Sequence, residues 1–502
     1  MKRSYILVLF SASLGSLAQA AEVIYAVATV QHNGDLTYTR SEDPTKLTAL
    51  GKQQLYNAAT FYRNRYVNAT SLFYIDGIRS TFDDSQVYAM APDQPYQVTS
   101  GQVFLQGLFP PQNLYNEPIP LQNGQTVQDP SNGIQFTTLH SVSPLDPNTI
   151  WLEAGDGCPN YQEQGSTYLQ SSEFLQMKTD SQSFYDSLID QYLAGVFSLD
   201  QIGYQSAFEI FNFMHHRSIY NSTFPQIDPE VLSHLKTLAD SYEWAMNGNA
   251  SSDHPALTVY GKALAFKIAE SLTINYDTAG MENKFTLLVS SYKSFLGFFG
   301  HAGLSDYSDD FKGLPNYAAT MVFELFSNEG KPSEGYPSES VLRVRFLFRN
   351  GTEDNESLSP FPIFGMMDIG LLEFQEKIDE FSVKNITQWC ELCSSHEWFC
   401  SEDGVGAGDG GDETSLGKGD APTDTSAGKE SHSHSPSPAV SGVIGAICVI
   451  VAVLLGFGIA MSLFGLRFAR TRKATTERGF RGGEKLPSEI DLSKIPPPAL
   501  KV

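Results

Sequence analysis

Basic residues are scarce in this chain of 502 residues: 33 lysines and arginines stand against 57 aspartates and glutamates, for a formal net charge of -24. The acidic excess is larger in the middle of the chain, because residues 1–20 carry a charge of +2 and residues 467–502 carry +5. A strongly acidic surface repels nucleic acids and other polyanions. We therefore expect no nucleic-acid partner, and any anionic ligand would need a local positive pocket.

Cysteine is also rare, with five residues, and one of them, Cys448, lies inside a long apolar run. The other four are Cys158, Cys390, Cys393 and Cys400. In an exported protein such an even number predicts two disulfides, and three pairings are open. The segment WCELCSSHEWFC, which contains His396, has the alternative interpretation of a zinc site, but an oxidising compartment favours disulfides. We expect no bound metal and no cofactor.

Two features indicate that the body of the protein is exported. Two basic residues, an apolar run over residues 5–17 and small residues ending at Ala20 have the pattern of a signal peptide, which we assign to residues 1–20. Asparagines in glycosylation sequons follow, as expected of an exported glycoprotein. They are Asn68, Asn221, Asn249, Asn350, Asn355 and Asn385.

A second apolar run, residues 439–466, contains no charged side chain and is long enough to span a bilayer core of about 30 Å. Arg467 and further basic residues follow, so residues 467–502 are predicted to be a cytoplasmic tail. Residues 401–438 are acidic, rich in Gly, Ser and Pro, and have the composition of a disordered stalk. We expect a single-pass type I protein of the plasma membrane or another secretory-pathway membrane, with residues 21–400 as an extracellular or lumenal ectodomain.

The ectodomain alternates between strand and helix patterns, which indicates an α/β fold. The β-branched and aromatic run of residues 23–30 predicts a buried strand before a polar loop, and residues 46–66 have the apolar spacing of a helix. From Tyr74 the pattern predicts strand, turn, strand and helix. The helix after Asp228 is the best marked, with an N-cap, a first-turn proline and a terminating Asn-Gly pair. The other expected elements are helices within 171–217 and over 258–272, a strand in 285–292, a helix from Lys293, and two strands in 316–326 and 340–354.

The loop after the first strand is the expected ligand site, because open α/β sheets bind ligands at the carboxyl ends of their parallel strands. This loop reads Gln31-His32-Asn33-Gly34-Asp35-Leu36-Thr37. It resembles the Arg-His-Gly-x-Arg-x-Pro motif of the histidine acid phosphatases, the branch of the phosphoglycerate-mutase-like superfamily that includes phytases. The resemblance covers residues 23–400 and implies an open sheet with flanking helices, into which a helical cap is inserted at roughly residues 160–250.

The resemblance also implies roles for individual positions. In the family, the motif histidine attacks phosphorus, three arginines bind the phosphate, and a later His-Asp pair supplies a ligand and the general acid. These residue types suit nucleophilic attack, bidentate phosphate binding and protonation of the leaving group. Here only His32 remains as the candidate catalytic nucleophile. The degenerate positions are Gln31, Asn33 and Asp35 in the motif, Tyr96 for the third arginine, and Ser291 and Tyr292 for the His-Asp pair.

Other basic residues are candidates to replace what the motif lacks. Arg40 and Arg79 lie near the relevant loops in the sequence, although neither has the motif spacing. His301 is an alternative catalytic histidine, or an ordinary histidine near the end of a helix, where the dipole favours it. The adjacent pair His215 and His216 points to different sides of a helix, which argues against a metal site.

The sequence therefore supports two functions. The favoured one is a cell-surface glycoprotein with a phosphatase fold and an impaired catalytic site, which acts as a binding or interaction ectodomain. The alternative is an active acid phosphatase that hydrolyses phosphomonoesters through a phosphohistidine at His32. The expected partners are the membrane and a phosphorylated small molecule or another extracellular ligand. A spacer role in the cell wall is a third, purely structural hypothesis.

Overall fold

A computed structural model describes residues 22–38, 45–112, 118–353 and 357–401. Several features expected from the sequence lie outside the described residues: the signal peptide, the stalk, the span with its tail, Arg40 and the sequon at Asn355. Within the described ranges, no helix is both long enough and apolar enough to cross a membrane.

A mixed sheet forms the centre of the body, in the strand order β10-β8-β7-β1-β6-β2-β5, with β9 paired to β8. The first strand, β1 (Val23–His32), lies between β6 (Phe285–Ser290), to which it is parallel, and β7 (Thr320–Ser327), to which it is antiparallel. The other strands are β2 (Val87–Pro92), β5 (His140–Val142), β8 (Arg343–Arg349), β9 (Ser359–Pro360) and β10 (Ile369–Gly370). The predicted open α/β sheet is confirmed.

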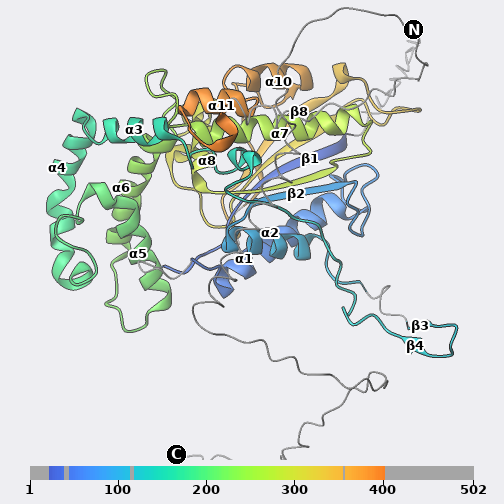
Figure 1. Cartoon of the computed structure of the whole chain (residues 1–502), viewed down its shortest axis with the longest axis horizontal. Helices are drawn as coiled ribbons and strands as arrows, with labels where there is room; N and C mark the ends of the chain where they lie inside the picture. Colours follow the sequence, from blue (N-terminus) through green and yellow to red (C-terminus); the bar gives the residue numbers. More distant parts are fainter. Residues whose placement is uncertain (1–21, 39–44, 113–117, 354–356, 402–502) are drawn as a thin grey trace, which may run out of the picture. The chain divides into compact units, whose positions relative to one another are not determined.

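Helices cover both faces of this sheet (Figure 1). On one face lie α1 (Ala49–Tyr62) and α2 (Pro95–Leu108); on the other lie α7 (Val259–Asp277), α8 (Tyr292–His301) and α10 (Leu371–Asp379). Because side chains alternate along a strand, β1 contributes to two cores. Val27 packs with the first pair of helices, whereas Ala28 packs with the second group. Burial on both faces explains why the strand is an uninterrupted apolar run.

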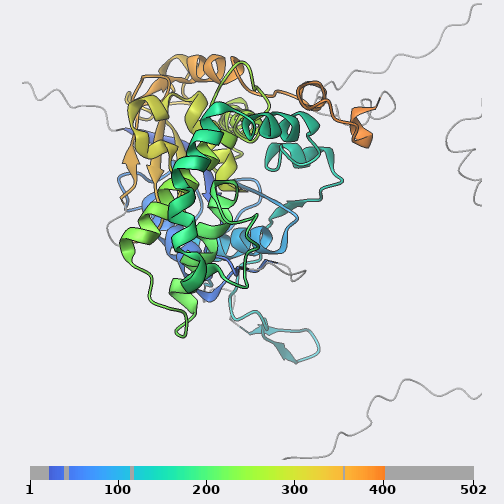
Figure 2. The ribbon, with the colours of Figure 1, turned by 90° about the vertical axis from the view of Figure 1, so that its left-hand side faces the viewer.

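A helical region with its own apolar cluster lies beside the sheet (Figure 1, Figure 2). Its helices are α3 (Pro159–Tyr168), α4 (Ser172–Ser187), α5 (Ala207–Tyr220) and α6 (Pro229–Asn247). In α6 the Asp228 side chain accepts a hydrogen bond from the backbone N–H of Glu230, and Gly248 is the C-cap. The boundaries predicted for this helix are confirmed.

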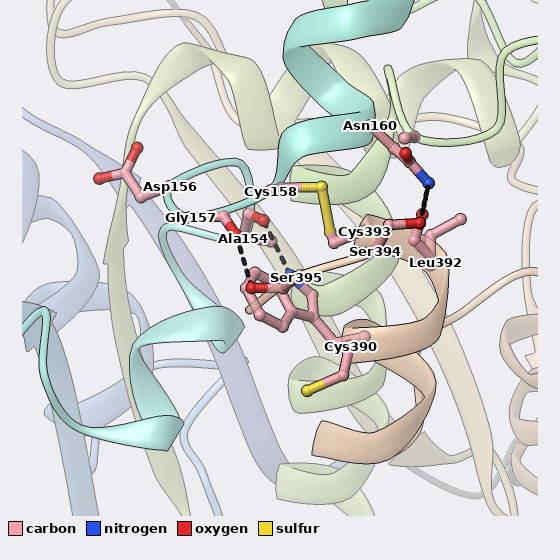
Figure 3. Close-up of a disulfide and its surroundings, with 12 residues drawn as sticks. Ala154, Asp156, Gly157, Cys158, Asn160, Cys390, Leu392, Cys393, Ser394 and Ser395 are labelled. Atoms are coloured by element: carbon pink, nitrogen blue, oxygen red, sulfur yellow. Dashed lines mark hydrogen bonds between the residues drawn. A yellow bond between two sulfur atoms is a disulfide. The ribbon is translucent and has the colours of Figure 1, made fainter. Parts of the chain in front are cut away.

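Two disulfides fix the end of the described body: Cys158–Cys393 and Cys390–Cys400. The first joins the start of α3 to the end of α11 (Ile386–Cys393), as Figure 3 shows. Around it, the Asn160 amide donates to Leu392 O, and the Ser395 hydroxyl donates to Gly157 O. Since all four cysteines are paired, the zinc interpretation of this cluster was wrong.

The strand predicted at Tyr74 was also wrong, because the chain there makes only an isolated bridge between Ile24 and Ile75. Gly77, with φ of +74°, turns the chain away before a second bridge can form. The predicted helix over 46–66 divides into α1 and a π-helical turn over Arg63–Val67, in which the Asn68 N–H donates to Arg63 O.

The sequence did not indicate the hairpin of β3 (Ile119–Pro120) and β4 (Thr126–Val127). The other short elements are α9 (Leu304–Tyr307), a π turn over Ile189–Leu193, and 3-10 turns over Pro147–Trp151, Tyr204–Ser206, Asp309–Lys312, Glu339–Val341 and Trp398–Cys400.

Candidate functional site

The carboxyl ends of three neighbouring parallel strands meet at one edge of the sheet, where a cavity of about 870 Å³ opens. His32 ends β1, and Ser291 and Tyr292 directly follow β6. Tyr96 lies in the first turn of α2, just after β2. All four line the cavity together with Asn33, and helices α5 and α6 supply the opposite wall. Parallel pairing thus brings together positions that are far apart in the sequence.

His32 lies at the base of this cavity in an aromatic environment, and only 5% of its surface is exposed. Its Nδ1 is 2.9 Å from Asn316 O, and because a carbonyl only accepts, Nδ1 must carry the proton. This leaves a lone pair on Nε2. The ring of Tyr317 stacks on the imidazole with centroids 5.7 Å apart, and Tyr292 approaches it edge-on at 6.4 Å. Burial lowers the pKa of His32 to about 4, so the ring is neutral near pH 7.

Gln31, at the first arginine position of the motif, does not line the cavity. Its side chain is fully buried against the backbone of the sheet. The amide donates to His32 O at 2.9 Å and to Ala319 O at 3.2 Å, and its carbonyl accepts from Thr320 Oγ1 at 2.9 Å. The glutamine is therefore a structural link between β1 and β7.

Asp35, at the second arginine position of the motif, also does not line the cavity. Its carboxylate accepts hydrogen bonds from Thr48 Oγ1, at the N-cap of α1, and from the Tyr220 hydroxyl at the end of α5. Beside it, Gly34 packs so closely that a Cβ there would lie 2.3 Å from Gly51 O. These contacts hold the loop against α1, and only glycine fits at position 34.

Buried carboxyl groups lie behind two of the tyrosines in the cavity. Burial, followed by the nearby Glu153 carboxyl, raises the pKa of Tyr96 to about 12. Burial also raises the pKa of Glu153 to about 7, although its Oε1 accepts a hydrogen bond from Gln97 at 2.8 Å. The pKa of Tyr292 is raised by burial and by Glu243. Both tyrosines are therefore neutral hydrogen-bonding groups and cannot replace a cation.

Few positive charges line the cavity. Lys236 does so, but its Nζ lies 2.9 Å from both carboxylate oxygens of Asp240. Among the described residues that line the cavity there is no arginine. Arg79 pairs with Asp83 on an exposed surface, so the proposal that it replaces a motif arginine was wrong. Arg40 lies outside the described residues.

The alternative histidines do not form a second centre. His301 Nε2 is 2.8 Å from Thr258 Oγ1, and its ring stacks on Phe381 away from the cavity. The interpretation of His301 as a catalytic residue was therefore wrong. His215 lines the cavity, whereas the neighbouring His216 packs on Tyr220. The two rings thus diverge, as predicted from their spacing.

Two groups of cavity residues were not predicted from the sequence. Asn316 and Tyr317 precede β7, and because β7 is antiparallel to β1, its start lies where β1 ends. The sequence pattern predicts the two strands but not their direction, and the direction decides which end of β7 lies at the cavity. Phe208 and Glu209 come from α5. Their helical pattern revealed no cavity, because the packing of α5 depends on contacts remote in sequence.

The described sequons lie on loops or at helix ends. Asn68 and Asn249 are exposed, and Asn221 follows α5. Asn350 Oδ1 accepts from the Asn316 N–H, and Asn385 caps α11 through a hydrogen bond from the Gln388 N–H. Both hydrogen bonds use the amide oxygen Oδ1, whereas an N-glycan is linked to the amide nitrogen Nδ2, so they do not block glycan attachment.

The sequence of this chain matches that of a known protein family. The family model described as histidine phosphatase superfamily (branch 2) matches residues 19–349, and the chain belongs to this family. The prostatic acid phosphatase of Mus musculus is 24% identical over 357 residues, covering 70% of this chain and 82% of the relative. That of Rattus norvegicus is 25% identical over 324 residues, covering 63% and 72%. The resemblance inferred from the first loop is confirmed.

Solved phytase structures are also similar to the chain. The phytase from Citrobacter braakii matches with a TM-score of 0.47 and 11% identity, over 72% of this chain and 99% of its own. The apo form of Hafnia alvei phytase matches with a TM-score of 0.48 and 12% identity, over 74% and 99%.

Proposed function

We propose that this protein is a member of the histidine phosphatase family whose catalytic site is impaired, and that its body binds a ligand in the cavity around His32. The observation that carries the proposal is that no arginine is among the described residues lining that cavity. The Gln31 side chain is hydrogen-bonded to the backbone of the sheet, and the Asp35 carboxylate is hydrogen-bonded to the N-cap residue of α1. Neither side chain is therefore available to bind phosphate.

The missing arginines set the size of the expected defect. A charge-assisted hydrogen bond contributes about 1.5 to 3 kcal/mol, so the loss of three lowers phosphate stabilisation by about 5 to 9 kcal/mol. At about 1.4 kcal/mol per factor of ten, this corresponds to a rate about three to six orders of magnitude lower. Ser291 and Tyr292 also provide no carboxylic acid to protonate the leaving alkoxide.

Hydrolysis of p-nitrophenyl phosphate and phytate by the purified full-length protein tests this proposal. At acid pH we expect turnover indistinguishable from that of His32→Ala and of His254→Ala, a histidine remote from the cavity. Turnover typical of phosphatases, lost in His32→Ala and retained in His254→Ala, would reject the proposal.

One observation favours the alternative, an active acid phosphatase. The hydrogen bond from His32 Nδ1 to Asn316 O keeps a lone pair on Nε2, which is the state a nucleophile requires. Under this alternative an acid-labile phosphate is trapped on the wild-type protein during turnover, and none on His32→Ala. The similarity of this chain to prostatic acid phosphatases supports it as well.

For localisation we propose a type I membrane protein with residues 21–438 outside the cytoplasm. Support comes from the charge-free run of residues 439–466 and from the basic residues after it. Protease treatment of intact cells is expected to leave a small fragment carrying a C-terminal tag. Digestion of the tag itself from outside would contradict this topology.

A further inference from the structure

The cavity that contains His32 is walled by aromatic rings from separate parts of the fold. They include Tyr38, Tyr96, Phe208, Phe211, Tyr292 and Tyr317. Around the base, Tyr317 stacks on His32, and Tyr292 lies 5.0 Å from Phe208 between ring centroids. On the α5 side, Phe211 stacks on His215 at 5.6 Å. The rings therefore surround the space on the sheet side and on the α5 side.

The charges around these rings are predominantly negative. Glu209 lines the cavity, its side chain is exposed, and it makes no hydrogen bond or ion pair with any described residue. Lys236 is neutralised by its ion pair with Asp240. Asp35 lies near Tyr317 and adds to the negative potential behind that ring. The described residues thus place the carboxylate of Glu209, which has no ion-pair partner among them, in the same cavity as a set of aromatic rings.

We propose that this cavity binds an organic ammonium cation, held by the aromatic faces and by the carboxylate of Glu209. The inference deepens the proposed binding function and rests on it. The negative face of an aromatic ring attracts a cation, and desolvated cation–π contacts contribute about 2 kcal/mol each. The neutral His32 ring offers a further acceptor, Nε2, to a ligand that carries an N–H.

The same features disfavour other ligand classes. A phosphate ester would place its negative charge against Glu209 without a described arginine to compensate it. A neutral apolar ligand would fill the aromatic space but would gain no attraction from the carboxylate of Glu209. An alkylammonium group satisfies both parts of the site, because its carbon atoms contact the rings while its charge pairs with the carboxylate.

Calorimetric titration of the full-length protein with choline tests the proposal. The control ligand is dimethylbutanol, an uncharged isostere of choline in which carbon replaces nitrogen. We expect choline to bind at least about tenfold more tightly than the isostere. Glu209→Gln and Phe208→Leu should each weaken choline binding by about tenfold. Glu163→Gln removes an exposed carboxylate on α3 and serves as the matched control, with unchanged affinity.

Each contrary outcome is informative. Equal binding of choline and dimethylbutanol, or no choline binding, would overturn the ammonium assignment and leave the impaired phosphatase site standing. Tight binding of inorganic phosphate that Arg40→Gln abolishes would overturn both, because it would reveal an intact anion site. Choline binding that Glu209→Gln does not weaken would place the ligand elsewhere and also reject the proposal.

Discussion

The imidazole of His32 and the phenol ring of Tyr317 lie nearly parallel, with an interplanar angle of 14° and centroids 5.7 Å apart. His32 ends β1, whereas Tyr317 precedes β7, so the antiparallel pairing of these strands creates the contact. The stacked ring helps to exclude water from the histidine. This exclusion disfavours the imidazolium form and gives the residue a measurable pH signature.

His32 should make the protein less stable as the pH falls. Its pKa is 6.5 in the unfolded chain and about 4 in the folded protein. Above pH 6.5 both states are neutral at this position, and between about pH 6.5 and 4 only the unfolded state gains the proton, which costs about 3 kcal/mol of folding stability. Urea unfolding at about pH 7 and about pH 4.5 should therefore show a smaller acid-induced loss for His32→Gln than for wild type. The same loss in both proteins would contradict the neutral, buried histidine.

Restoring an arginine at the first motif position should lower the folding stability of the protein. Gln31→Arg would place a guanidinium inside the sheet, where the native amide bridges β1 and β7 and no carboxylate is hydrogen-bonded to it. An uncompensated buried charge costs about 3 to 5 kcal/mol. Denaturant unfolding should show this loss for Gln31→Arg, but not for Gln53→Arg on the exposed side of α1. A stable Gln31→Arg protein that gains phosphate affinity would show that the side chain can reach the cavity.

The sequence predicted those parts of the fold that local patterns determine. The helix after Asp228 was predicted with its ends because its cap residues are local, and β1 because its apolar run is uninterrupted. A strand was predicted at Tyr74, but the chain there forms only an isolated bridge. The extent of pairing depends on Ile24, a partner remote in the sequence.

The same distinction holds for the site. His32, Ser291 and Tyr292 were identified from strand ends, which a parallel sheet brings together. Glu209 could not be found in this way, because its place in the cavity depends on how α5 packs against the sheet domain. The pairing of Cys158 with Cys393 was likewise one of three open alternatives until the fold brought them together.

Glu153 should have the opposite pH effect to His32. Burial raises its pKa from 4.5 to about 7, so between these values the folded state holds a proton that the unfolded state has released. Its protonation therefore supports folding below about pH 4.5, and this contribution, about 3 kcal/mol, is lost as the pH rises through about 7. Glu153→Gln keeps an acceptor for Gln97 and should remove this dependence in unfolding experiments, while Glu163→Gln should retain it. A Glu153→Gln profile parallel to that of wild type would show that the carboxyl is ionised in the fold.

The two disulfides should differ in their contribution to stability, because they close loops of very different length. Cys158 and Cys393 are 235 residues apart, whereas Cys390 and Cys400 are separated by 10. Loop-closure entropy predicts a loss of about 5 kcal/mol when the long loop is opened and about 3 kcal/mol for the short one. Replacing each cysteine pair by alanine avoids burying a polar group, since Cys158 and Cys393 have no exposed surface. Urea unfolding of the two double variants should rank Cys158→Ala/Cys393→Ala as the less stable; the reverse order would mean that local packing around α11, rather than loop closure, dominates.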